Sequence, residues 1–116
     1  TGGATSNVAF HHVYDPRVDR WTEAAPMPTA RSAGAHAEYR DMLFFAGGEC
    51  TADNRNFDQV EAYDPKTGSW RSFGVLPRGL HGFVGASVGD SLYFIGGSDP
   101  CGGGARLDNN FVFTLP

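Results

Sequence analysis

Short apolar runs separated by glycine and proline dominate the pattern of this chain. No window sustains an apolar period of 3.6 residues, so the sequence predicts almost no helix. The run Leu-Tyr-Phe-Ile at 92–95 is apolar at every position, which suits a strand that is covered on both faces. With 16 glycines and 7 prolines to form the turns, the pattern predicts an all-β protein.

The apolar runs mark nine segments as strands. They are expected near 8–14, 20–23, 33–39, 42–47, 58–63, 69–74, 82–88, 91–96 and 110–114. The segment at 33–39 is rich in alanine and glycine, which suits an innermost strand, where sheets converge on a common axis and large side chains would collide. Asp-Pro begins the segments 15–19 and 64–68, and both are therefore expected to be turns.

Aromatic residues and paired glycines recur at a step of 49 positions. They are Tyr14 and Tyr63, Trp21 and Trp70, and the pairs Gly47-Gly48 and Gly96-Gly97. Laid on 63–97 without a gap, the stretch 14–48 also matches at alanine, aspartate, leucine and phenylalanine positions. A period near 50 residues is typical of β-propeller blades, each a four-stranded antiparallel sheet.

The repeat divides the chain into three units. Residues 1–32 supply the third and fourth strands of one blade, 33–81 form a complete blade, and 82–116 supply the first three strands of another. Rings close with about four to eight blades, so we expect an incomplete ring. The chain begins at Thr1 without Met, which favours a piece of a longer propeller, either its last two and a half blades or an arbitrary truncation. A protomer that completes its ring with copies of itself is the alternative.

The repeated residues resemble kelch repeats, which carry a double glycine followed by a tyrosine and a tryptophan. Here tyrosine and tryptophan lie seven residues apart in both copies, one more than is usual in the family. Gly2-Gly3 would be the glycine pair of the first unit, with a shorter loop after it. The resemblance implies a kelch-type propeller fragment, with recognition as the usual role and sugar or sugar-acid epimerases and oxidases as enzymatic members.

Charge argues against two classes of partner. The 13 acidic and 9 basic residues give a net charge of −4, and the basic residues never run together. We therefore expect no binding to nucleic acid or to an anionic membrane surface. No apolar run approaches the roughly 20 residues that span a bilayer. The sequence leaves the cellular compartment open.

Polar residues in the loops at one end of the blades are the candidates for binding. The loops 49–57 and 98–109, and the blade connections 24–32 and 73–81, are expected at one mouth of the channel, where propellers gather functional residues. The candidates are Arg31, Glu49, Arg55, Arg78, His81, Asp99 and Arg106. Arginines there suit carboxylate or sugar-acid ligands. The alternative, favoured for each arginine by itself, is that they hydrogen-bond the loops together.

No motif predicts catalysis, a metal or a cofactor. His11 and His12 are neighbours in an expected strand, so they point to opposite faces and cannot share one ion. The stretch 53–58 lacks the glycine and distal glutamate of a calcium loop, and Asx-turns are its expected use. There is no Gly-x-Ser-x-Gly motif. The two tryptophans at repeat positions are expected in the core.

Cys50 and Cys101 fall in equivalent loops of adjacent blades. A disulfide needs Cα atoms within about 7 Å, which neighbouring loops can reach, but two free thiols are favoured.

These features predict a module that recognises a protein or a small polar ligand through loops at one face. The alternatives are part of a kelch-type enzyme and a self-assembling propeller protomer. Further blades of the same chain, or a homo-oligomer, would complete the ring.

Overall fold

A computed structural model describes residues 7–116, which form strands, turns and loops but no helix. There is accordingly no helix in that range with the length and apolar character needed to cross a membrane. The strands are β1 (His12–Asp15), β2 (Arg20–Glu23), β3 (Ala35–Tyr39), β4 (Met42–Gly48), β5 (Phe57–Asp64), β6 (Ser69–Val75), β7 (Val84–Val88), β8 (Ser91–Ile95), β9 (Ser98–Asp99), β10 (Ala105–Arg106) and β11 (Asn110–Phe113).

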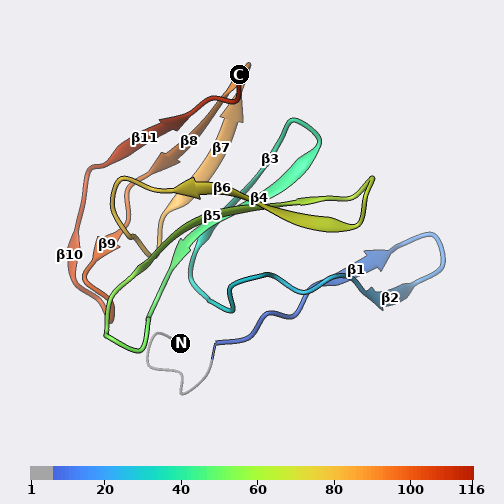
Figure 1. Ribbon diagram of the computed structural model, residues 1–116, viewed down its shortest axis with the longest axis horizontal. Helices are drawn as coiled ribbons and strands as arrows, with labels where there is room; N and C mark the ends of the chain where they lie inside the picture. Colours follow the sequence, from blue (N-terminus) through green and yellow to red (C-terminus); the bar gives the residue numbers. More distant parts are fainter. Residues whose placement is uncertain (1–6) are drawn as a thin grey trace.

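Antiparallel sheets account for all of these strands (Figure 1). The largest has four strands in the order β3-β4-β5-β6, and a second has three in the order β11-β8-β7. β1 pairs with β2, and β9 pairs with β10. The predicted all-β class is confirmed, and each of the nine expected strands is present. The two-residue strands β9 and β10 were not expected. The Gly2-Gly3 pair lies outside the described residues.

The hydrophobic core lies where the four-stranded and three-stranded sheets face each other. Phe44 of β4 and Phe94 of β8 are each 1% exposed, and Leu92 is fully buried. The ring of Phe113 reaches across to Phe44, with 5.8 Å between centroids. β4 and β8 are central in their sheets, and the neighbouring sheet covers only one face of each. Leu43 and Ile95, on the opposite faces, are 46% and 44% exposed, so the expectation that the run 92–95 is covered on both faces does not hold among the described residues.

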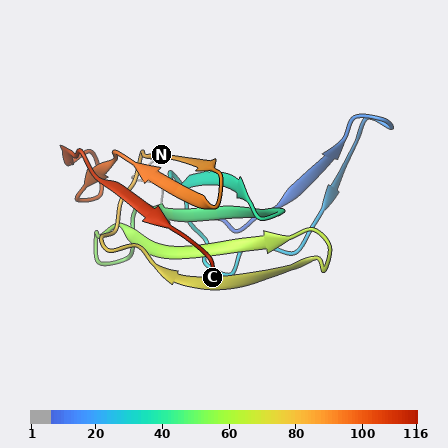
Figure 2. The ribbon, with the colours of Figure 1, turned by 90° about the horizontal axis from the view of Figure 1, so that it is seen from above.

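Small residues allow the two sheets to approach closely along β3 and β7 (Figure 2). A Cβ atom added at Gly85 in β7 would lie only 2.9 Å from the carbonyl oxygen of His36 in β3. The hydroxyl of Tyr39 then donates across the contact to the carbonyl of Asp90 at 2.6 Å. The alanine- and glycine-rich composition of the first strand is therefore a packing requirement.

Two constraints require the paired glycines at the end of β4: their backbone φ angles are positive, and neighbouring backbone leaves no room for a Cβ atom. Gly47 has φ +66° and Gly48 has φ +128°, a region that favours glycine. A Cβ atom at Gly47 would lie 2.6 Å from the carbonyl oxygen of Leu80, and one at Gly48 would lie 2.5 Å from that of Ser32. At this point the backbone N–H of Gly48 donates to the Leu80 carbonyl at 2.8 Å. The glycines thus let the segment that enters the next sheet bind directly to the end of β4.

The hairpin of β1 and β2 projects from the rest of the molecule (Figures 1 and 2). Trp21 in β2 is 66% exposed, so the prediction that it lies in the core is wrong. Trp70, its counterpart in β6, is partly buried, and its indole N–H donates to the carbonyl of Ala25 at 2.7 Å. The physical reason is that the segment after β2 covers Trp70, whereas no described segment covers Trp21.

A candidate binding face at the loop end of the sheets

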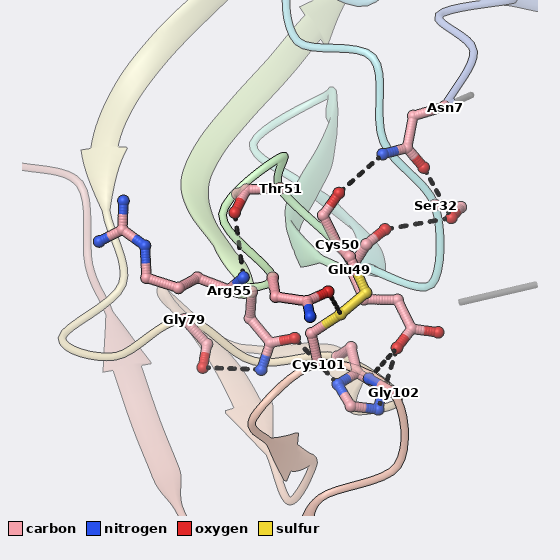
Figure 3. The surroundings of a disulfide bond; sticks show 12 residues. Asn7, Ser32, Glu49, Cys50, Thr51, Arg55, Gly79, Cys101 and Gly102 are labelled. Atoms are coloured by element: carbon pink, nitrogen blue, oxygen red, sulfur yellow. Dashed lines mark hydrogen bonds and ion pairs between the residues drawn. A yellow bond between two sulfur atoms is a disulfide. The ribbon is translucent and has the colours of Figure 1, made fainter. Parts of the chain in front are cut away.

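A disulfide joins the loops that follow β4 and β8. Cys50 and Cys101 are bonded to each other, with Cα atoms 5.5 Å apart (Figure 3). The prediction of two free thiols is therefore wrong. The two loops meet because His81 and Ser98 form an antiparallel bridge, which carries the start of the loop after β8 toward the end of β4. The sequence gives no distance between these two loops, so their contact is a finding of the structure.

Glu49 connects the same two loops beneath the disulfide. It is 8% exposed, and its Oε2 accepts a hydrogen bond from the backbone N–H of Gly102 at 3.1 Å (Figure 3). The same oxygen lies 3.4 Å from Nε2 of His81, and each of these two side chains is 11% exposed. Two of the predicted site residues, Glu49 and His81, are thus brought into contact.

Asn56 orients His81, and sequence reasoning missed it. The amide nitrogen of Asn56 lies 3.0 Å from the Ser98 carbonyl and 3.2 Å from a carboxylate oxygen of Asp99. Both partners are acceptors, so the Asn56 Oδ1 faces His81 and accepts a hydrogen bond from Nδ1 at 3.0 Å. The only sequence signal was its position in the polar stretch 53–58, which was interpreted as a set of Asx-turns.

Arg78 and Asp99 form an ion pair at the rim of this cluster. Nε and Nη2 of Arg78 lie 3.1 and 2.9 Å from Oδ2 of Asp99. The side chains are 45% and 30% exposed, so a ligand can reach both. Arg55 is further out: its side chain is 75% exposed, and its partner is Asp53 in the same loop at 3.4 Å. Arg106 in β10 is also exposed.

Arg31 is built into the interior of the protein. Its side chain is 0% exposed and lies 2.8 Å from the carboxylate of Glu61. It also donates to the carbonyls of Gly47 at 2.8 Å and Phe45 at 2.9 Å. Burial lowers the pKa of the Arg31 guanidinium, and the negative charge of Glu61 opposes this effect. Because no part of its side chain is accessible, we leave Arg31 out of the binding face.

The candidate binding face therefore consists of Arg55, Arg78, Asp99 and Arg106, next to the contacts that Glu49, Asn56, His81 and the disulfide make between the loops. Exposed guanidinium groups on loops joined in this way suit carboxylate ligands, because the planar fork binds both oxygens at once. The backbone of the 49–57 loop is also fixed locally, since the N–H of Thr51 donates to the carbonyl of Arg55 at 2.7 Å.

Comparison with known sequences supports the repeat. The sequence model of the family described as "Kelch motif" matches residues 30–74. This range contains β3, β4, β5 and nearly all of β6, together with the repeat residues Gly47-Gly48, Tyr63 and Trp70. No curated protein matches the chain.

Proposed function

Because the chain carries a kelch repeat and is a kelch-repeat module, we propose that it binds a protein or a small polar ligand through the binding face defined above. Kelch repeats generally mediate protein interactions, which gives the class of function. The observation that supports this particular surface is that the exposed Arg55 and Arg106 lie on the two loops that the Cys50–Cys101 disulfide cross-links.

The rigidity of the loops favours ligand binding rather than catalysis as the function of this face. A ligand that meets fixed loops does not have to order them, so less of the interaction energy is lost on binding. Glu49, Asn56 and His81 use their polar atoms on each other and on loop backbone, and they therefore hold the face in shape. The accessible groups are the guanidiniums of Arg55, Arg78 and Arg106, which fit an acidic peptide segment or a sugar acid.

A display experiment tests the proposal. Peptides are selected from a random library against the protein, and their affinities are measured for wild type and for the double variant Arg55→Ala, Arg106→Ala. We expect enriched peptides to carry Asp or Glu and to bind the double variant at least about tenfold more weakly, since a hydrogen bond to a charged group contributes roughly 1.5–3 kcal/mol. Galacturonate and sialic acid serve as small carboxylate probes in the same assay.

Lys66→Ala is the matched control. The Lys66 side chain is 77% exposed in the turn between β5 and β6, which lies outside the binding face. This variant removes one positive charge and should bind like wild type. Peptides that bind the double variant and wild type equally, or a selection in which neither peptides nor sugar acids bind, would refute the proposed face.

A second proposal concerns the apolar surfaces at the two sides of the molecule. A groove of ≈ 480 Å³ runs along β3 and β4 and is lined by apolar residues that include Val8, Phe10 and Leu43. On the other side, Val84 and Val88 of β7 are 61% and 67% exposed. Surfaces of this kind are unusual in isolated domains. We propose that further blades cover them, from the same polypeptide or from a second copy.

Sedimentation equilibrium distinguishes these two sources. Association that is weakened by Leu43→Asp, a substitution in the groove, would support a second copy. A monomer of 12.4 kDa at all concentrations would exclude it and leave a longer polypeptide as the source of the cover.

A further inference from the structure

We propose that reduction of the Cys50–Cys101 disulfide converts this end of the molecule into a zinc site. Its ligands are the two thiolates, a carboxylate oxygen of Glu49 and Nε2 of His81. This site lies in the residues that support the arginine face and uses none of the arginines, so the inference does not depend on the proposed binding function.

Three of the four proposed ligand atoms are already gathered. The sulfur atoms of Cys50 and Cys101 and a carboxylate oxygen of Glu49 all lie within 4.8 Å of one another. Two thiolates on one zinc ion are separated by about 4 Å, since each Zn–S bond is about 2.3 Å. The Cα atoms are 5.5 Å apart, so small side-chain rotations after reduction allow both sulfurs to reach one ion. Thiolate, imidazole and carboxylate are the ligand types that zinc prefers.

His81 is held in the orientation that a metal ligand requires. The amide of Asn56 donates to Ser98 and Asp99, so its oxygen can only accept from Nδ1 of His81. With its proton on Nδ1, the ring presents Nε2 toward Glu49 at 3.4 Å. Zinc-binding histidines are usually fixed in this way, by a hydrogen bond from the nitrogen that does not bind the metal.

The contact between Nε2 of His81 and Oε2 of Glu49 places two of the proposed ligand atoms side by side. They lie 3.4 Å apart, which is a separation that two ligands of one tetrahedral zinc ion have, since each bond is about 2.0–2.2 Å long.

The oxidation state of Cys50 and Cys101 determines whether the loops are joined by the disulfide or by a zinc ion. A dithiol reductant transfers two electrons and two protons to the disulfide, which gives two cysteine thiols and the oxidised form of the reductant. Zinc then replaces the two thiol protons, which are released to water. The disulfide has no thiolate to offer, so oxidised protein should bind zinc weakly or not at all. The loops are thus cross-linked by a covalent bond in one state and by a metal ion in the other.

Cobalt titration tests the proposal directly. Co²⁺ is added to the oxidised protein and to protein that has been reduced and freed of reductant without oxygen. We expect the reduced protein to bind one equivalent, with a thiolate-to-cobalt charge-transfer band and strong visible bands typical of tetrahedral coordination. Zinc should then displace the cobalt. Equal spectra for the oxidised and reduced proteins would overturn the proposal.

Single substitutions identify the ligands. Cys101→Ser should abolish tetrahedral binding, and His81→Ala should shift the visible bands and weaken affinity. His36→Ala is the matched control, since His36 is exposed in β3 and should have no effect. Retention of the wild-type spectrum by Cys101→Ser or by His81→Ala would refute the assigned ligand set. Circular dichroism of each variant confirms that it is folded.

Asn56→Leu tests the role of Asn56 in positioning His81. Loss of a partner behind a metal ligand typically weakens metal binding by about 10–100-fold, and we expect a decrease of this size with the tetrahedral spectrum retained. A second measurement does not depend on spectra: zinc should protect both cysteines of the reduced protein from iodoacetamide, as read by mass spectrometry. Unchanged alkylation in the presence of zinc would contradict the site.

Discussion

The β1–β2 hairpin and the β5–β6 hairpin are two copies of one sequence pattern in different surroundings. Tyr14 lies opposite Trp21 in the first, and Tyr63 lies opposite Trp70 in the second. In both turns the first aspartate accepts a hydrogen bond from the backbone N–H two residues later, at 2.9 Å. The local geometry of the hairpin is therefore the same in both copies.

Burial differs between the two copies. Trp21 is 66% exposed and contacts the ring of Tyr14. Trp70 makes the equivalent contact with Tyr63, but it also packs against the ring of His11 and donates to Ala25, both from the segments beside the first hairpin. The repeat sequence thus specifies the hairpin, whereas the neighbouring repeat determines whether its aromatic residues are covered.

The largest expected difference between the hairpins concerns charge. Glu61 in β5 occupies the same repeat position as His12 in β1. Glu61→Gln leaves the buried Arg31 guanidinium without a counter-ion and should lower the free energy of unfolding by about 3 kcal/mol. His12→Gln is the control, because the His12 side chain is 45% exposed, and it should change stability by less than about 0.5 kcal/mol. Urea denaturation measures both.

A compensated variant sharpens this result. Arg31→Met combined with Glu61→Leu removes both charges, and apolar replacements of buried ion pairs are often tolerated. The double variant should be more stable than Glu61→Gln alone. Equal stability losses for Glu61→Gln and His12→Gln would show that the pair contributes nothing specific to the second hairpin.

The tryptophans should give the next largest difference. Trp70→Ala removes a partly buried ring and its hydrogen bond, and we expect a loss of roughly 2–3 kcal/mol, below the range for fully buried aromatic residues. Trp21→Ala should cost less than about 1 kcal/mol, since it loses mainly one exposed aromatic contact. Thermal and urea unfolding measure the two changes. A loss for Trp21→Ala as large as that for Trp70→Ala would mean that the exposed hairpin is covered in solution.

The turns should show a smaller effect. Gly68 has φ +70°, and the first hairpin places Asp19 at the same repeat position with φ +48°. Gly68→Ala should cost about 1 kcal/mol because alanine is disfavoured there. Gly68→Asp should cost less, since a Cβ atom at this position lies 4.0 Å from the Tyr63 hydroxyl, where the carboxylate could accept a hydrogen bond. Urea unfolding of both variants measures the two costs. A Gly68→Asp variant that is less stable than Gly68→Ala would contradict this view of the turn.

The smallest effect is a titration in the exposed hairpin. The Tyr14 hydroxyl donates to Oδ1 of Asp19 at 2.7 Å, and this bond raises the pKa of Tyr14 above its usual value. The stabilisation is present at neutral pH, below the unfolded pKa, and it is lost as pH rises through the folded pKa. Asp19→Asn should lower the pKa of Tyr14, as measured by NMR of labelled tyrosine. An unchanged titration would show that the bond is absent in solution.

Strand positions were predictable because the 49-residue step repeats the apolar runs themselves. β9 and β10 were missed because two-residue strands inside a glycine-rich loop leave no apolar pattern. The burial of Arg31 was also missed, although Leu80 stands at the same repeat position and is fully buried. That match was a usable sign that residue 31 points inward.

The site depended on distances between loops, which a linear pattern does not contain. Glu49 and His81 were both candidates, but their contact and the Cys50–Cys101 bond arise from the meeting of separate loops. Asn56 was overlooked because its role, fixing the orientation of His81, appears only when three separate segments are seen together.

The cross-link between Cys50 and Cys101 spans 51 positions and encloses β5 to β9 in one covalent circle. Closing a circle of that size removes unfolded-chain entropy equivalent to about 4 kcal/mol. The strands inside cannot be peeled away singly from either end, so the two sheets should open as one unit. A protease that cuts once within the circle, for example at the exposed turn after β7, would leave both pieces tethered until a reductant is added.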